Sequence, residues 1–161
     1  KQLNTRAELY SCIVNWSTNE TDLSFCFKQN NLITTIPLLD TNNVTNMEQT
    51  FCECTNLTTI PLLDTSNVTM MMNMFNGCTS LSIVPLLNTI NVINMGNMFI
   101  KCTSLSDESL NNILAMCTNA TKISSSHKTL KYIGLTEEQA IKCKTLSNYS
   151  AFTSAGWTTG Y

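Results

Sequence analysis

Charged residues are scarce in this sequence. Asp, Glu, Lys and Arg make up 12% of its 161 residues, against about 25% in a typical soluble domain, and the formal net charge is −2. Polarity comes instead from 24 Thr, 20 Asn and 15 Ser. Because nucleic acids and anionic membranes are bound largely through clustered positive charge, the composition gives no electrostatic reason to expect either as a partner.

Long apolar runs are also missing, so we expect no membrane insertion, which needs about 18 or more consecutive apolar residues. The chain begins at Lys1 without a signal-like apolar segment, whereas residues 157–161 are typical of a natural C-terminus. We interpret the sequence as the C-terminal piece of a longer protein whose upstream region holds any export signal, anchor or oligomer contacts.

Recognisable catalytic motifs are missing too. The sequence has no glycine-rich phosphate loop, no HExxH and no EF-hand. Its single histidine, His127, follows three serines, but side chains adjacent in sequence rarely form a triad, and no acid is placed to orient the ring. We therefore predict that the protein is not an enzyme and uses no cofactor.

The Cys52-x-Cys54 pair raises the question of a metal site. A four-ligand zinc site needs a second convergent pair of Cys or His, and only one histidine is present. Later repeats replace Cys52 with Asn76 and Ile100, so the pair is not a repeated feature. We predict no metal ion.

What the sequence does contain is a 24-residue unit written three times over residues 33–104. Successive copies agree at 15 and then 14 of 24 positions, and they read ITTIPLLDTNNVTNMEQTFCECTN, LTTIPLLDTSNVTMMMNMFNGCTS and LSIVPLLNTINVINMGNMFIKCTS. A fixed period of this length predicts coils that each bury an apolar side by stacking on their neighbours. We expect a single domain: an N-terminal cap and partial coil (1–32), three repeats (33–104) and a C-terminal cap (105–161).

The predicted fold class is an α/β solenoid, a right-handed stack of leucine-rich-repeat-like coils. Short parallel strands are expected at residues 33–36, 57–60 and 81–84, with Leu57, Ile60 and Leu62 pointing inward. Met74, Phe75 and Cys78 have the spacing of a helical turn. A helix over residues 4–16 and a degraded coil over 22–31 precede the repeats, because Phe27 lies 24 residues before Phe51.

Three columns of the repeat are predicted to be structural. They are the rings of Phe51, Phe75 and Phe99, the thiols of Cys54, Cys78 and Cys102, and an internal amide ladder of Asn43, Asn67 and Asn91. Flanking apolar columns favour reduced thiols over disulfides, although stacked coils about 4.7–4.9 Å apart do not forbid a bridge.

The C-terminal cap is predicted to be α+β. Ser106 is placed to cap a helix over residues 107–117, and residues 130–135 are typical of a strand. Residues 136–139 form a capping-box sequence that opens a second helix, and a turn from Asn148 ends at Gly156.

The units LLDTSNVT and MFNGCTSL, with their 24-residue spacing, resemble the BspA-like leucine-rich-repeat family. Its members are bacterial surface proteins and tail-fibre or tail-tip proteins of phages that infect gut Firmicutes. The resemblance covers residues 33–105 and extends to cap segments such as LKYIGLTEEQA and AGWTTGY. It implies an extracellular place, on a cell surface or a virion, and adhesion instead of chemistry. One departure is the repeated Asn, which comes two residues later than in the standard unit.

We therefore predict a surface-recognition module, an adhesin or phage receptor-binding domain, that binds a host cell-surface glycan or protein. The expected binding positions face outward from the predicted strands: Thr34, Thr35, Thr58, Thr59, Ser82 and Ile83. Outward columns such as Asn42/Ser66/Ile90, Glu48/Met72/Gly96 and Glu53/Gly77/Lys101 vary between repeats, as a binding surface does. Two alternatives stay open, a structural spacer or assembly element and a targeting module for an upstream enzyme.

Overall fold

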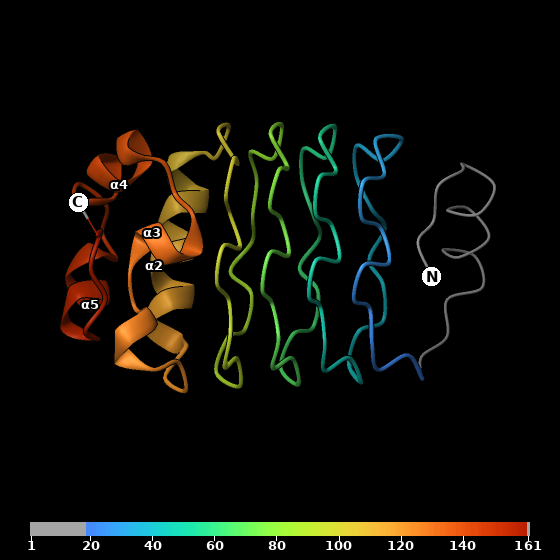
Figure 1. Ribbon diagram of the computed structural model, residues 1–161, viewed down its shortest axis with the longest axis horizontal. Coiled ribbons are helices and arrows are strands. Elements are labelled where there is room, and N and C mark those ends of the chain that lie inside the picture. The colour runs from blue at the N-terminus through green and yellow to red at the C-terminus, as the bar shows by residue number, and fades with distance from the viewer. Residues whose placement is uncertain (1–18, 161) are drawn as a thin grey trace.

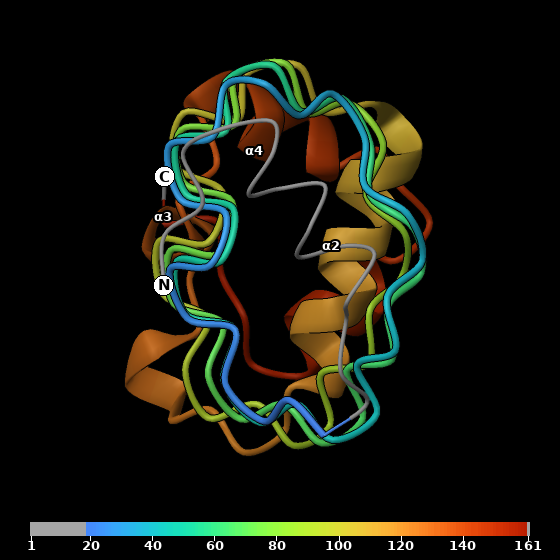
Figure 2. The ribbon, with the colours of Figure 1, turned by 90° about the vertical axis from the view of Figure 1, so that its right-hand side faces the viewer.

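The computed structural model describes residues 19–160 as a stack of flat coils closed by helices at its C-terminal end (Figure 1). The helices are α2 (Asp107–Asn119), the 3-10 helix η1 (Ser125–His127), α3 (Leu130–Ile133), α4 (Glu137–Cys143) and α5 (Tyr149–Ser154). Each 24-residue repeat makes one coil, and the coil outlines superpose when viewed along the stack (Figure 2). The predicted helix over residues 4–16 lies outside the described residues.

A column of phenylalanine rings forms the centre of the core. The centroids of Phe27 and Phe51 lie 5.3 Å apart, those of Phe51 and Phe75 5.6 Å, and those of Phe75 and Phe99 5.7 Å. All four side chains are at most 1% exposed. Because Phe27 continues the column, the prediction that a further coil begins before the first complete repeat is confirmed.

The predicted α/β class is wrong. Between residues 19 and 160 the backbone forms no β-strand, and pairing between coils is limited to isolated parallel bridges such as Asn46↔Met70 and Thr59↔Ile83. Of the three predicted strands, 57–60 and 81–84 share only that second bridge. The turn holding Met74, Phe75 and Cys78 is not helical either, although all three side chains are fully buried.

Hydrogen bonding along residues 46–53 explains why no strand forms. Alternate N–H groups, those of residues 47, 49, 51 and 53, donate to carbonyls of the next coil at 2.6–3.0 Å. The N–H groups between them, such as those of Thr50 and Cys52, instead close turns within their own coil. Half of the donors that a ladder would use are thereby diverted, so the segment is a chain of turns held to its neighbours by every second peptide unit.

Two columns of each coil adopt left-handed backbone to make these turns. In the first, φ is 60°, 52°, 55° and 57° at Phe25, Gln49, Asn73 and Asn97; in the second, φ is 59°, 60°, 80° and 62° at Gln29, Glu53, Gly77 and Lys101. This conformation costs about 1–2 kcal/mol for a residue with a Cβ atom. Gly77 therefore marks a left-handed position that every described coil shares.

The predicted internal asparagine ladder lies at the surface. The amides of Asn67 and Asn91 do bond backbone carbonyls of the preceding coil, at 2.6 and 2.7 Å, but Asn43 and Asn67 are exposed and Asn91 is half-buried. The interior ladders are made by shorter side chains, which fit between coils without displacing the apolar core. They are the hydroxyls of Thr41, Thr65 and Thr89, which donate to carbonyls of the following segment, and the thiols of Cys54, Cys78 and Cys102, which donate to carbonyls of the preceding coil.

The C-terminal cap is helical, and so the predicted strand over residues 130–135 is wrong. The last carbonyls of a helix have no partner within the helix. In α3 the carbonyls of Tyr132 and Ile133 instead accept from the N–H groups of Asn97 and Phe99 in the last coil, at 2.5 and 2.8 Å. A single parallel bridge, Thr129↔Thr158, is the extended pairing in this part of the cap.

The helix signals in the cap are confirmed. Ser106 caps α2 by accepting from the N–H of Ser109, and Thr136 and Gln139 form a complete capping box on α4. Gly156 follows α5 with φ at 83°. Side chains of α2 then take the place of a further coil: Ser109 Oγ accepts from the N–H of Val84 and donates to the carbonyl of Ser82, both at 2.8 Å.

Candidate binding face

The six predicted binding residues lie side by side on one side of the stack. Thr34, Thr58 and Ser82 form one column, since each carbonyl of the first two accepts from the N–H of the next residue, at 2.9 and 3.0 Å. Thr35, Thr59 and Ile83 form the neighbouring column, joined by the Thr59↔Ile83 bridge. We call the outward positions of residues 34–40, 58–64 and 82–88 the lateral face.

Hydroxyl groups of this face are partly used within the stack. Thr58 Oγ1 donates to the carbonyl of Thr34 at 3.0 Å, and Ser82 Oγ approaches the carbonyl of Thr58 at 3.3 Å. Each of these hydroxyls keeps only its acceptor capacity for a partner. The Thr34 and Thr35 side chains, at the N-terminal side of the face, are exposed.

An exposed row of leucines runs along the same face and was missed by sequence reasoning. Leu38, Leu62 and Leu86 are 72%, 62% and 46% exposed, whereas Leu39, Leu63 and Leu87 beside them are buried. The expectation that Leu62 points inward is therefore wrong, and Leu63 fills the core instead. Each repeat carries the pair as Pro-Leu-Leu, so the sequence holds the signal but does not say which leucine faces out.

The acidic residues of the face stabilise turns. Asp40, Asp64 and Asn88 occupy one column, and their side-chain oxygens accept from the N–H two residues later at 3.3, 2.9 and 3.1 Å. Hydrogen bonds from the hydroxyl and backbone of Ser66 lower the pKa of Asp64. The carboxylates therefore carry charge onto the face as a consequence of the turn that they close.

The variable columns have three different origins. Gly96 replaces Glu48 and Met72 because a Cβ atom there would lie 2.6 Å from the ring of Tyr132 in α3. Gly77 lies in a left-handed column, as described above. The column of Asn42, Ser66 and Ile90 has no such structural cause, and its third member is 53% exposed. Of the three variable columns, the column of Asn42, Ser66 and Ile90 is therefore the one whose variation still favours a binding surface.

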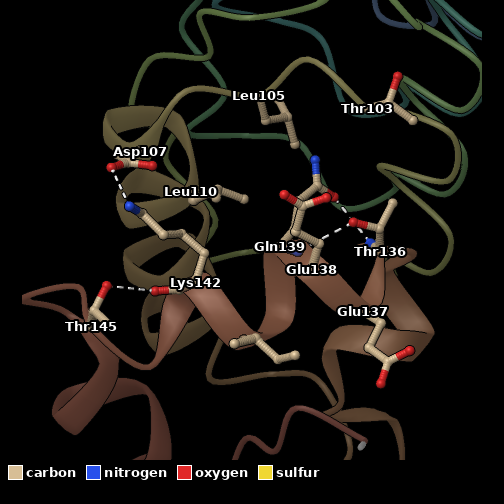
Figure 3. A pocket seen from close by; sticks show the side chains of 11 residues that line it. Thr103, Leu105, Asp107, Leu110, Thr136, Glu137, Glu138, Gln139, Lys142 and Thr145 are labelled. Carbon is tan, nitrogen blue, oxygen red and sulfur yellow. Dashed lines mark hydrogen bonds and ion pairs between the residues drawn. The ribbon is translucent and has the colours of Figure 1, made fainter.

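A hollow lies between α2 and α4 in the cap (Figure 3). It has a volume of ≈720 Å³, and the ion pair between Asp107 and Lys142, 2.9 Å long, spans it. Two of its polar side chains already serve the fold, because Gln139 donates to the carbonyl of Cys102 at 2.7 Å and pairs with Thr136 in the capping box. The hollow thus lies where α4 packs against α2 and the end of the last coil.

The thiols of the repeated cysteine column are unreactive. Among residues 19–160 all cysteines are free thiols, and burial raises the pKa of both Cys54 and Cys102 to about 12. A thiol with so high a pKa is neither a nucleophile nor a ready metal ligand at neutral pH. In the same part of the chain, no three His, Cys, Asp or Glu side chains converge as metal ligands.

His127 is exposed and stacks on Tyr132 with ring centroids 4.9 Å apart. Two of the neighbouring serines bond each other, since Ser124 Oγ and Ser126 Oγ share a hydrogen bond of 3.0 Å.

Between residues 19 and 160 no helix has the length and apolar character needed to cross a bilayer.

The fold and the lateral face together define a repeat protein whose capped stack of coils presents recurring side chains in rows. Residues 21–132 match the family described as "Mycoplasma protein of unknown function, DUF285", and the chain belongs to that family. Neither a curated protein nor a solved structure gives a significant match.

Proposed function

We propose that this protein is a non-enzymatic recognition module that binds a protein or glycan on a host cell through its lateral face. The observation that carries the proposal is the row of Leu38, Leu62 and Leu86, which recurs in every repeat and yet stays exposed. Packing accounts for a repeated residue that is buried. A repeated aliphatic side chain in water gains free energy only when a partner covers it.

Aliphatic rows favour a protein over a glycan as that partner. Sugar hydroxyls buried against leucine lose their hydrogen bonds to water without replacement, which costs free energy. The Thr34 and Thr35 hydroxyls at the N-terminal side of the face remain suited to polar contacts with either partner. The resemblance of the repeat to BspA-like surface proteins supports an extracellular place, on a cell or a virion.

Retention on a glycan array and on a panel of intact bacterial and eukaryotic cells tests this function. We expect the purified chain to be retained, and a Leu38→Ser, Leu62→Ser variant to lose at least about tenfold in apparent affinity, since central apolar contacts dominate interfaces. Ile141→Ser is the matched control, because Ile141 is 55% exposed but lies on α4. We expect that control to bind as the parent does.

Two results would contradict the proposal. Equal retention of the leucine variant and the parent would move binding away from the lateral face. If the folded parent is retained on no glycan and no cell, the alternative of a structural spacer or assembly element gains support, because a regular stack of coils also makes a rigid rod.

A further inference from the structure

A groove with a polar lining runs across neighbouring coils of the stack. It has a volume of ≈360 Å³, and apart from one glycine its lining residues are Asn, Gln, Thr, Glu and Lys. Along the chain it is separate from the lateral face, because its last residue in the middle coils, such as Thr55, lies three residues before that face begins. We call it the polar groove.

Two charged residues of the polar groove have a left-handed backbone that is unfavourable for them. φ is 60° at Glu53 and 62° at Lys101, whereas Gly77 in the coil between them adopts the same conformation without steric cost. For a residue with a Cβ atom the cost is about 1–2 kcal/mol. Both side chains are exposed, so burial does not offset it. Strain that packing does not offset is characteristic of functional sites.

The charges of these two residues are open to a ligand. The Glu53 carboxylate accepts one hydrogen bond, from Gln29 Nε2 at 2.8 Å, and has acceptor capacity left. Among residues 19–160 the Lys101 ammonium has no hydrogen-bond or ion-pair partner. Two coils separate the backbones of Glu53 and Lys101, a distance of about 10 Å at the usual spacing. A Cβ atom at Gly77 would lie 3.0 Å from Glu53 Cγ, so glycine leaves room for that side chain.

Uncharged side chains add both donors and acceptors to the polar groove. Asn76 Nδ2 donates to Asn73 Oδ1 at 2.9 Å, which leaves the Asn76 carbonyl oxygen and its second N–H for a ligand. Thr79 Oγ1 lies 3.4 Å from the carbonyl of Thr55 and keeps its acceptor capacity. The lining as a whole holds one carboxylate and one ammonium, so its formal charge is zero.

We propose that the polar groove binds a neutral oligosaccharide. A sugar hydroxyl both donates and accepts, so the hydroxyls of one oligosaccharide can bond to the carboxylate and to the ammonium. A ligand with a single charge would be attracted by one of these groups and repelled by the other. An apolar ligand would remove water from the polar lining without replacing its hydrogen bonds. On a cell coated with glycans, this contact would add to the one made by the lateral face.

Titration of the isotope-labelled protein with soluble oligosaccharides, followed by amide chemical shifts, tests the site. The probes are neutral oligosaccharides of glucose, galactose, mannose and N-acetylglucosamine. An open site that binds through hydrogen bonds is weak, so we expect a Kd of about 1 mM. Saturable shift changes are expected at residues 29–31, 53–55, 76–79 and 101. Such a contact is too weak to hold the chain on an array or a cell through washing, which separates this measurement from the retention test above.

The test variant is Glu53→Ala, Lys101→Ala, which removes both charges and leaves the net charge unchanged. We expect it to bind at least about tenfold more weakly, because hydrogen bonds to charged groups are stronger than those between neutral groups. The matched control is Glu137→Ala, Lys144→Ala, which removes the same two charges from exposed positions at the two ends of α4. It should bind as the parent does, and circular dichroism verifies that both variants are folded.

Three results would overturn the proposal: a folded parent that binds none of the neutral oligosaccharides, equal binding by the parent and the groove variant, or shift changes confined to other residues. Tighter binding of sialylated or sulfated oligosaccharides than of neutral ones would overturn the ligand class. The Leu38→Ser, Leu62→Ser variant should bind the soluble oligosaccharides as the parent does, because the lateral face takes no part. The polar groove and the proposed function can therefore fail separately.

Discussion

Removing the ring of Phe75 tests the coil stack directly. The side chain is fully buried in the middle of the phenylalanine column, with ring centroids 5.6 and 5.7 Å from its two neighbours. Truncating a buried phenylalanine to alanine costs about 3–5 kcal/mol. Each aromatic pair contributes about 0.5–1.5 kcal/mol beyond buried area, and two pairs are lost here, so we expect the upper part of that range.

Urea unfolding monitored by circular dichroism measures the lost free energy of unfolding. We expect a lower midpoint urea concentration and an unchanged dependence of the free energy on urea. At this chain length 1 kcal/mol lowers the Tm by about 2–4 °C, so Phe75→Ala should melt roughly 8–20 °C below the parent. Leu62→Ala in the same coil is the control, because Leu62 is 62% exposed and its truncation should change stability by less than about 0.5 kcal/mol. A Phe75→Ala protein within about 1 kcal/mol of the parent would refute the continuous ring column as the source of stability.

Three further predictions concern the backbone, a thiol and a carboxylate. Lys101→Gly should stabilise the protein by about 1 kcal/mol in urea, because φ is 62° there, whereas Gly77→Ala should destabilise it, since its Cβ atom would meet Glu53 Cγ at 3.0 Å. The Cys78 thiol, whose pKa is raised mainly by burial, should resist alkylation at pH 8 until urea unfolds the chain; rapid labelling of the native protein would contradict its burial. The folded pKa of Asp64 is lowered, so its contribution to stability is present above the unfolded pKa of about 3.9 and is lost as pH falls through the folded value. Asp64→Asn should therefore lose less stability than the parent between pH 5 and pH 2, and parallel pH profiles would rule this out.

The stacking of repeats could be predicted because it depends on identity at a fixed period. Residues 24 apart share size and polarity, so columns such as Phe51 and Phe75, or Cys54 and Cys78, must meet whatever the backbone does between them. The capping roles of Ser106 and Thr136 could also be predicted, because helix capping depends on a few neighbouring side chains.

Backbone conformation within the coil was not readable in the same way. Gln49 and Glu53 have left-handed φ, but neither residue type signals that conformation in a sequence. In the column of Glu53, Gly77 is the one residue that favours left-handed φ. Alternation of apolar residues then suggests a strand, although every second N–H closes a turn. The order of Leu38 and Leu39 depends on that same backbone, which is why the exposed row was missed.

The alternating peptide units also give the stack a direction. Along the segment that begins at residue 46, every aligned N–H points toward the following coil and every aligned carbonyl toward the preceding one. Along this segment the coils therefore have unlike ends: the end that faces the cap offers N–H donors, and two of them are bound here by the carbonyls of Tyr132 and Ile133. The column of Thr34, Thr58 and Ser82 runs the other way, with carbonyls that face the following coil. A coil inserted between two others would offer each of them the same backbone groups that they otherwise offer each other. The stack can therefore change in length by whole 24-residue units, and the same C-terminal cap fits every length.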